Sequence, residues 1–421
     1  MIGMRVIAVR AERLVYRVAA LPIALWAAMH FDDGSVSPVR HAFAWRYWHP
    51  DGPYEWLELA FGVALSPFAL AIAILWFTAR NGPSVRRRRD KGLWAQASDQ
   101  LRLYFRAGIL APWYYIFSLY RDGDAARARS FLQRSETKWG VFYLLRVRHA
   151  SPLSDKKKFA DRCIANGVPC VDYVTCLDGS AADRAVTTLP DTDLFVKPAN
   201  GRGGKGAERW DRVDRHVYAD AAGMLLDEQA LLERLRKLGR SRPVLVQRRM
   251  LPDPAISDLT SGALPTVRVL TCLNEYGKAE VMAAVFRMSV GRNRTVDNIH
   301  AGGIACGVSL DQGLLGPASN LGMDARLGWL DRHPDTDAPI AGRTLPMWQE
   351  VKALAVQAHA AFDDRAIVGW DIAILPDGPT VVEGNGSPDM DLMQRFMDRG
   401  FCNHRFAELL THHLRRRGYV A

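Results

Sequence analysis

The sequence predicts an α+β protein that is preceded by an apolar helical region, and three observations lead to this prediction. Residues 59–77 are nineteen consecutive positions without a charged side chain, which is nearly enough to cross a hydrocarbon core of about 30 Å. The whole net charge of +10 lies in residues 1–150, which hold 21 basic and 11 acidic side chains. From Ser151 onward, short apolar runs alternate with helical patterns, and 34 basic side chains balance 34 acidic ones.

We therefore expect a membrane anchor over residues 1–92, an amphipathic helical connecting region over 93–150 and an α+β domain over 151–421. A protein that binds nucleic acid through this domain is not expected, because the domain carries no excess of basic residues. Disorder is excluded by a composition of 48% hydrophobic and 24% charged residues. The six cysteines form no CxxC pair, so we interpret them as reduced thiols.

The apolar run at residues 59–77 has the flanks of a membrane helix. Trp56 and Trp76 would lie at the two interfaces, and Arg86–Arg89 follow directly. The positive-inside rule then places the C-terminal side in the cytoplasm. The alternative is a buried helix in a protein core.

A shorter uncharged run, Val18–Met29, leaves three alternatives open. It is a second span that forms a hairpin with the first, an interfacial helix, or a cleaved signal peptide. Residues 93–121 are aromatic and amphipathic, and they would lie on a bilayer surface or pack on the α+β domain.

The α+β domain is expected to begin with a helix capped by Ser154 and ended by Gly167 and Pro169. Further helices are expected at 221–239, 346–362 and 403–417, and loops at 251–264 and 311–344. Strands are expected at 193–198, 243–248, 266–273, 279–288, 302–309, 366–374 and 379–383.

The last two of these strands flank a Pro-Asp-Gly turn and predict a hairpin that carries acidic side chains. Folding the chain about Asp377 brings Asp371 opposite Glu383, and Asn385 joins them through the two-residue period of a strand. Two facing carboxylates favour a cation between them, and oxygen ligands suit Mg²⁺. The alternative is an ordinary hairpin whose acidic residues are solvated.

A second motif follows the strand that contains Lys197. The loop after it holds Gly201, Gly203, Gly204 and Gly206, whose backbone amides can surround phosphate oxygens. No apolar helix follows the loop, as a dinucleotide site requires, and no Ser or Thr follows its lysine, as a Walker A loop requires. The loop therefore binds phosphate in another way, or it is only a flexible hairpin tip.

Basic and polar residues elsewhere in the domain are further candidates. Lys156–Lys158 stand at a helix start, where a lysine run is usually a solvated face. Arg268 and Arg287 lie on apolar strands, and burying them requires an anionic ligand or an acidic neighbour. The same group of candidates includes Thr266, Asp297, Asn298, His300, Gly302 and Gly303.

Taken in this order, the motifs resemble those of ATP-grasp enzymes over about residues 110–400. More narrowly, Thr266-Val267-Arg268 and the segment 296–303 resemble the sugar-transfer-associated ATP-grasp group, which is related to α-L-glutamate ligases. The resemblance implies two α+β lobes that hold ATP. It also implies Mg²⁺, with Mn²⁺ as a substitute.

The resemblance assigns roles to individual residues. Lys156 and Lys197 would contact phosphates, the loop Gly201–Gly206 would close over them, and Gln247, Arg248 and Arg249 would line the adenine. Asp371, Glu383 and Asn385 would hold the metal. Asp253 and Asp258 are the nearest candidates for a ribose ligand, and any of the three lysines 156–158 is a candidate for the first phosphate contact.

The function expected from these motifs is ATP-dependent ligation of a carboxylate to an amine or similar nucleophile through an acyl phosphate. Arg268 and Arg287 would orient the carboxylate, and Asp297, Asn298 and His300 would also contact substrate. The alternatives are a kinase with the same ATP site and a non-catalytic membrane scaffold. We expect attachment to the inner membrane, contact with its lipids, a domain that faces the cytoplasm, an envelope-linked substrate and no nucleic-acid partner.

Overall fold

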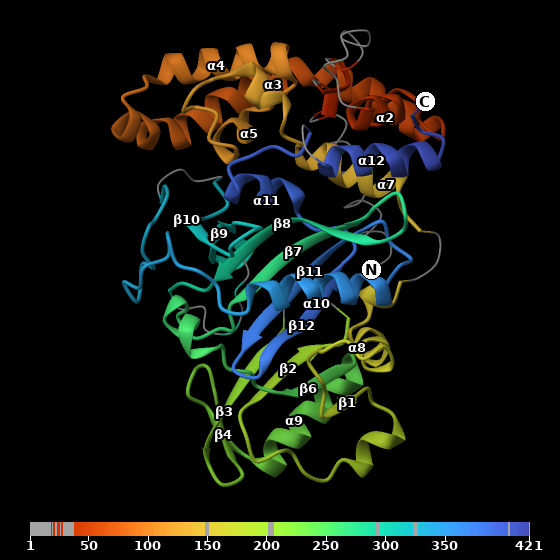
Figure 1. Cartoon of the computed structure of the whole chain (residues 1–421), viewed down its shortest axis with the longest axis vertical. Coiled ribbons are helices and arrows are strands. Elements are labelled where there is room, and N and C mark those ends of the chain that lie inside the picture. The colour runs from red at the N-terminus through yellow and green to blue at the C-terminus, as the bar shows by residue number, and fades with distance from the viewer. Residues whose placement is uncertain are drawn as a thin grey trace. The chain divides into compact units, whose positions relative to one another are not determined.

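A computed structural model describes residues 38–147, 151–200, 206–291, 299–322, 327–402 and 405–420, with Thr295, Asp297 and positions 18, 20, 21, 23–25 and 27. The chain forms two compact units. The first comprises residues 1–146, 321–328 and 389–421, and the second comprises residues 147–320 and 329–388. We call them the helical unit and the α+β unit (Figure 1).

The described elements of the helical unit are helices from both ends of the chain. They are α2 (Pro38–Trp48), α3 (Pro53–Arg89), α4 (Leu93–Ala107), α5 (Ala111–Ile116), α6 (Ala125–Arg129), the π-helical turn η1 (Glu136–Val141), α7 (Phe142–Leu144), α11 (Met390–Phe396) and α12 (Arg405–Arg416).

Helix α3 contains the apolar run expected at residues 59–77. It has 37 residues, starts with a proline in its first turn and ends at Asp90 in a left-handed conformation. Among the described residues it is the one helix whose length and composition would allow it to cross a membrane. Of the twelve positions of the earlier run, Val18–Met29, five lie outside the described residues, and the seven described positions are helical.

Two buried glutamines attach α4 to the C-terminal half of α3. Gln100 donates to the Thr78 hydroxyl at 2.7 Å, and Gln96 donates to the Gly82 carbonyl at 3.1 Å. Val85 joins the apolar core formed by α4, α5 and the segment after α6, which includes Phe131. The aromatic residues of the 93–121 region therefore largely form this core.

The N-terminal half of the unit is held by buried ion pairs. Arg40 of α2 donates to Glu136 at 2.7 Å and to the Phe131 carbonyl at 2.8 Å, and both charged side chains are almost fully buried. Arg46 contacts Glu55 of α3 at 3.1 Å and also donates to the hydroxyl of Tyr143 at 3.3 Å.

The last helices of the chain pack on the helical unit. Gln394 of α11 donates to the Leu132 carbonyl, and Arg395 donates to the Ile116 carbonyl. Asp391 is buried and pairs with Arg134 at 3.1 Å. The compact α+β unit ends at residue 388.

The α+β unit contains two six-stranded antiparallel sheets. The strand order is β1-β6-β2-β3-β4-β5 in the first sheet and β10-β9-β8-β7-β11-β12 in the second. The strands are β1 (Thr175–Leu177), β2 (Leu194–Pro198), β3 (Glu208–Asp214), β4 (Val217–Asp220), β5 (Leu225–Asp227), β6 (Val244–Arg248), β7 (Thr266–Leu273), β8 (Ala279–Met288), β9 (Ile304–Val308), β10 (Leu315–Ser319), β11 (Ile367–Leu375) and β12 (Gly378–Asn385).

Helices cover one face of each sheet. On the first sheet, α9 (Glu228–Ser241) buries Leu231 and Leu235 against the strands. On the second, α10 (Trp348–Ala361) and α8 (Lys156–Ala165) pack into one apolar core that includes Trp370. The helices fix which face of each sheet remains free for a site.

Several local expectations are corrected. Asp155, not Ser154, caps α8, because its carboxylate accepts hydrogen bonds from the Lys157 and Lys158 amides. The helix expected at 221–239 starts only at Glu228, after strand β5. The expected loops contain the 3₁₀ helix η4 (Pro254–Leu259) and strand β10. All six cysteines are free thiols.

Candidate active site

The hairpin β11–β12 brings its two acidic residues opposite each other, as the sequence predicts. Asp371 pairs with Glu383 in the ladder, and Gly369 pairs with Asn385. The tight turn would otherwise place Val382 opposite Asp371, because Leu375 pairs with Gly378. A β-bulge in β12 shifts the register by one residue and thereby puts both carboxylates on one face.

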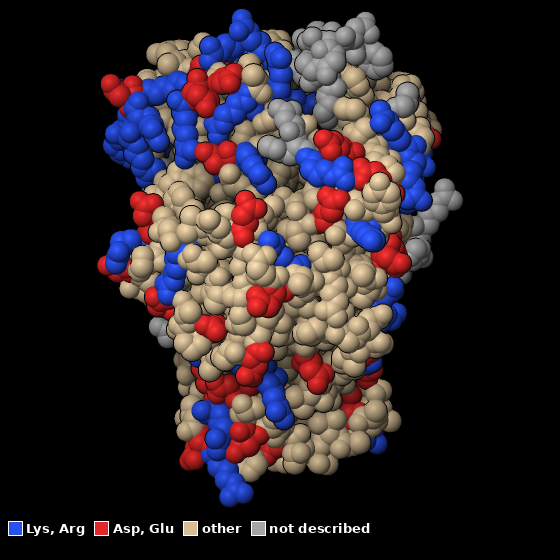
Figure 2. All heavy atoms as spheres, viewed as in Figure 1, with Lys and Arg blue, Asp and Glu red and all other residues tan. Residues whose placement is uncertain are grey.

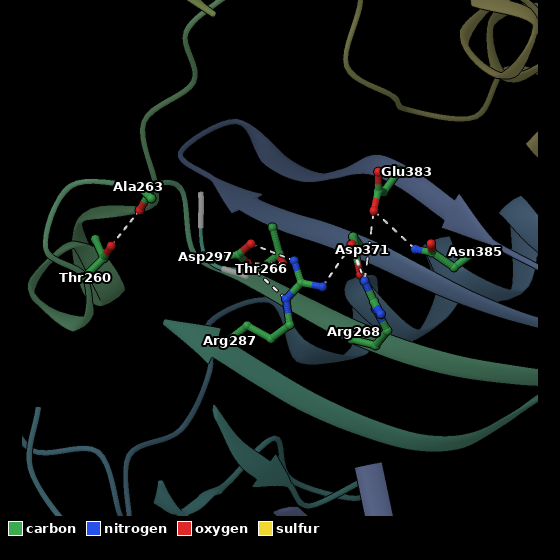
Figure 3. Close-up of polar contacts among 9 residues, drawn as sticks. All are labelled: Thr260, Ala263, Thr266, Arg268, Arg287, Asp297, Asp371, Glu383 and Asn385. Atoms are coloured by element: carbon green, nitrogen blue, oxygen red, sulfur yellow. Dashed lines mark hydrogen bonds and ion pairs between the residues drawn. The ribbon is translucent and has the colours of Figure 1, made fainter. Parts of the chain in front are cut away.

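Asp371 lies at the centre of a charge cluster (Figure 3). In the ladder it also pairs with Arg268 of β7, which donates to both of its carboxylate oxygens. Arg287 of β8 donates to Asp371 Oδ2 at 3.0 Å. Burial by itself would raise the pKa of this carboxyl, which is 2% exposed, but the two guanidinium groups outweigh burial and lower the pKa to about 2.

Arg287 is held from its other side by Asp297. Its Nη2 donates to Asp297 Oδ1 at 2.6 Å and its Nε to Oδ2 at 3.2 Å. The Thr266 hydroxyl donates to the same carboxylate at 2.5 Å. Both arginines therefore have acidic neighbours, which is one of the two alternatives expected for arginines on apolar strands. Asp297 also fixes the direction of Arg287.

Two lysines from other elements face this cluster. Burial lowers the pKa of Lys197 on β2 to about 8, Glu383 opposes this shift, and Lys156 adds to it. Burial also lowers the pKa of Lys156 at the start of α8, and Glu383 opposes it there as well. The Lys156 amide donates to the Ala199 carbonyl at 3.1 Å, which ties α8 to the end of β2. Two lysines and two arginines around these carboxylates suit a phosphate-bearing ligand.

Glu383 is the part of the cluster that fits a cation. Burial and the neighbouring Asp371 raise the pKa of Glu383 above its usual range. Asn385 donates to Glu383 Oε1 at 3.3 Å, which places an amide beside the two carboxylates. Asp371 receives three N–H donors in these contacts, and a carboxylate has about four acceptor positions. The side-chain oxygen atoms of Asp371, Glu383 and Asn385 are the kind of ligand that Mg²⁺ prefers, so these residues fit a Mg²⁺ site.

The remaining residues of the predicted site lie in several places. Gln247 is on the same face of the first sheet as Lys197, because Phe195 pairs with Gln247 and Lys197 with Leu245, and its amide donates to the Asp172 carbonyl at 3.0 Å. Arg248 is exposed, whereas Arg249 pairs with Asp193 and Asp211.

Other predicted positions are exposed or are not described. His300 is exposed, and Asn298 and residues 201–205, with Gly201, Gly203 and Gly204, lie outside the described residues. Gly206 is described and has a φ of 76°, which favours glycine. The two ribose candidates make local contacts: Asp253 caps η4, and Asp258 pairs with Arg343 at 2.9 Å.

Two antiparallel sheets, each covered by a helix, and a row of acidic and basic side chains facing two lysines define an ATP-grasp protein. The chain belongs to the sugar-transfer-associated ATP-grasp family, whose model matches residues 144–407. This match confirms the resemblance drawn from the sequence motifs. No curated protein sequence matches the chain.

Solved structures with similar folds share little sequence with this chain. A D-cycloserine synthetase is 16% identical, with 62% of this chain and 71% of that chain covered and a TM-score of 0.37. The D-alanyl-alanine synthetase A of Vibrio cholerae is 12% identical, with 63% and 65% covered and a TM-score of 0.37. The D-alanine–D-alanine ligase of Bacillus anthracis is 13% identical, with 63% and 69% covered and a TM-score of 0.35.

Proposed function

We propose that this protein is an ATP- and Mg²⁺-dependent ligase that joins a carboxylate to an amine or a similar nucleophile. The observation that carries the proposal is the row Arg287–Asp371–Arg268 beside Glu383. The paired carboxylates provide a metal site, and the two guanidinium groups next to it provide a place for an anionic substrate. Family membership supports the use of ATP.

In the proposed reaction, a carboxylate oxygen of the substrate attacks the γ-phosphorus of ATP, and ADP leaves. The nucleophile then attacks the acyl carbon, loses a proton and displaces inorganic phosphate. Lys156 and Lys197 would neutralise the phosphates, while Arg268 and Arg287 would hold the substrate carboxylate in line with the phosphorus. Asp297 would keep Arg287 in position. Mg²⁺ bound to Asp371, Glu383 and Asn385 would supply charge neutralisation at the transferred phosphoryl group.

The adenine and substrate contacts are also part of the proposal. Gln247, Arg248 and Arg249 would line the base, and the glycine loop 201–206 would close over the phosphates. Asn298 and His300 would approach the substrate together with Asp297. The helical unit would attach the protein to the cytoplasmic side of the inner membrane, where the substrate would be an envelope precursor or a polysaccharide-linked carboxylate.

A kinase would use the same ATP site but would form no acyl phosphate. Hydroxylamine distinguishes the two functions, because it traps an acyl phosphate as a hydroxamate. We expect hydroxamate to form when the protein is screened with ATP, Mg²⁺ and candidate carboxylates, including amino acids and uronic acids. ADP release without hydroxamate would favour the kinase, and failure to bind Mg-ATP in calorimetry would favour a scaffold.

The variant Glu383→Gln tests the metal site. It removes one negative charge from the proposed Mg²⁺ ligands, so we expect ADP release to fall by about 100-fold or more, in the range seen for lost electrostatic stabilisation. Asp377→Asn is the matched control, because it makes the same chemical change in the exposed turn of the same hairpin. Full ADP-forming turnover in Glu383→Gln would refute the assignment.

A further inference from the structure

Helix α3 has two different faces along its length. The covered face includes Leu59, Gly62, Ser66, Asn81 and Val85, all of which are buried. The opposite face carries a stripe of exposed apolar side chains at helical spacing. This stripe consists of Leu57, Phe61, Leu65, Phe68, Ile72 and Leu75.

Both ends of α3 are connected to one continuous segment of the helical unit, residues 111–144, the C-terminal end through a shared apolar core and the N-terminal end through Arg46 of α2. Near its N-terminus, Glu55 and Tyr143 both bind Arg46. Near its C-terminus, Val85 packs in the same core as Tyr115 and Phe131. The two contacted ends are about 45 Å apart, because 30 residues separate them at about 1.5 Å each.

The segment that joins these two contact regions cannot lie in hydrocarbon. Residues 132–142, between Phe131 and Tyr143, contain three charged side chains, Arg134, Glu136 and Lys138, and charged groups in the bilayer interior are strongly unfavourable. If α3 crossed a membrane, its two ends would lie on opposite sides, and residues 132–142 would have to cross as well. The two ends of α3 therefore lie on the same side of any membrane that the helix enters.

We propose that α3 lies in the plane of an anionic bilayer, with its exposed apolar stripe inserted among the acyl chains and the rest of the helical unit on one side. A row of exposed apolar side chains fits a lipid layer better than water. This inference rests on the membrane attachment proposed above, but it replaces a spanning helix with a monotopic one and does not depend on the ligase chemistry.

Basic side chains next to the stripe match the negative charge of such a bilayer. Arg86–Arg89 are on the last turns of α3, and Arg102 and Arg106 are exposed on α4 beside the exposed Phe105. Figure 2 shows Lys and Arg gathered on the helical unit over the elements labelled α3 and α4 in Figure 1. Basic residues near an anionic surface are attracted to it.

Vesicle flotation tests the partner. The full chain should float with phosphatidylcholine vesicles that contain about one quarter phosphatidylglycerol, and binding should weaken with added salt. The double variant Phe68→Glu, Ile72→Glu should reduce the bound fraction by about tenfold or more. Leu225→Glu is the control, because Leu225 is 61% exposed on the α+β unit, against 70% for Phe68 and 67% for Ile72. Absence of flotation, with dimers that the double variant separates, would assign the stripe to a second copy and overturn the proposal.

Labelling from one side tests the orientation. Gly52 and Gly92 flank α3, and an added Cβ at either position meets no atom within 4 Å. The single variants Gly52→Cys and Gly92→Cys are treated with a membrane-impermeant maleimide in spheroplasts and in inside-out vesicles, and the labelled peptides are identified by mass. The first native cysteine is Cys163, so labelled peptides around positions 52 and 92 contain no native thiol. The native cysteines therefore need not be removed.

Under the proposal, both cysteines react only in inside-out vesicles. Reaction of the two cysteines from opposite sides would show a spanning helix and overturn it. ADP-forming activity is measured in parallel. If the protein shows no ADP-forming activity but floats and is labelled as expected, the result counts against the ligase alone. If it is active but its two cysteines react from opposite sides, the result counts against the in-plane helix alone.

Discussion

Affinity for Mg-ATP should fall as the pH rises through the pKa of Lys197. In the free protein this pKa is lowered to about 8 by burial. The ammonium form binds phosphate, and bound phosphate in turn favours that form, so affinity is constant below the free-state pKa and decreases above it. The protonated fraction is about 90% at pH 7 and about 10% at pH 9, which weakens binding about tenfold, or by about 1.4 kcal/mol.

The measurement is calorimetric titration of the full chain with Mg-ATP at pH 7, 8 and 9. Lys197→Arg keeps its charge over this range and should remove the Lys197 contribution, while Lys197→Met should bind weakly at every pH. Lys156 also has a lowered pKa, so Lys156→Arg is measured to separate its contribution. A wild-type affinity that does not change between pH 7 and 9, or the same decrease in Lys197→Arg, would refute the reasoning.

Two further predictions concern stability. Glu136→Gln should destabilise the helical unit by about 3–5 kcal/mol in chemical unfolding, because it leaves the buried Arg40 without its charged partner. The control variant Glu408→Gln changes an exposed ion pair and should lower the free energy of unfolding by less than about 1 kcal/mol. Gly384→Ala should cost the α+β unit about 1–3 kcal/mol, because its Cβ would lie within 3 Å of two packed side chains. Gly316→Ala on another strand meets only one backbone oxygen, at 3.7 Å, and should be nearly neutral. Equal melting temperatures within either pair of variants would contradict the corresponding prediction.

Much of the second sheet could be predicted because its strands are continuous apolar runs bounded by turns. In the hairpin that carries Asp371 and Glu383, the facing pair could be predicted from the sequence but the bulge could not. Folding the chain about Asp377 gives the observed pair, but the structure reaches it through a two-residue turn and a bulge that compensate each other. Bulges depend on packing against neighbouring strands, which local sequence does not reveal.

The first sheet was harder to predict because strand β3 is highly charged and strands β1, β4 and β5 have only three or four residues each. Strand β3 reads Glu-Arg-Trp-Asp-Arg-Val-Asp, and only Trp210 is buried. Its polar side chains are instead paired with neighbours, as Arg249 is with Asp211. The sequence also could not show whether the two site arginines are paired with acidic residues or with a ligand. Asp297 is ten residues from Arg287 along the chain, so their contact is visible only in the folded structure.

The position of α11 and α12 in the helical unit has a consequence for the order of synthesis. The α+β unit, residues 147–320 and 329–388, lies in the chain between residues 146 and 389 of the helical unit and is interrupted by its residues 321–328. At a translation rate of about 5–20 residues per second, the last helices leave the ribosome about 12–50 s after the segment that contains Arg134. The α+β sheets can close during that interval, whereas Arg134 must wait for Asp391. The described part of the helical unit can therefore be completed only after the whole α+β unit has been synthesised.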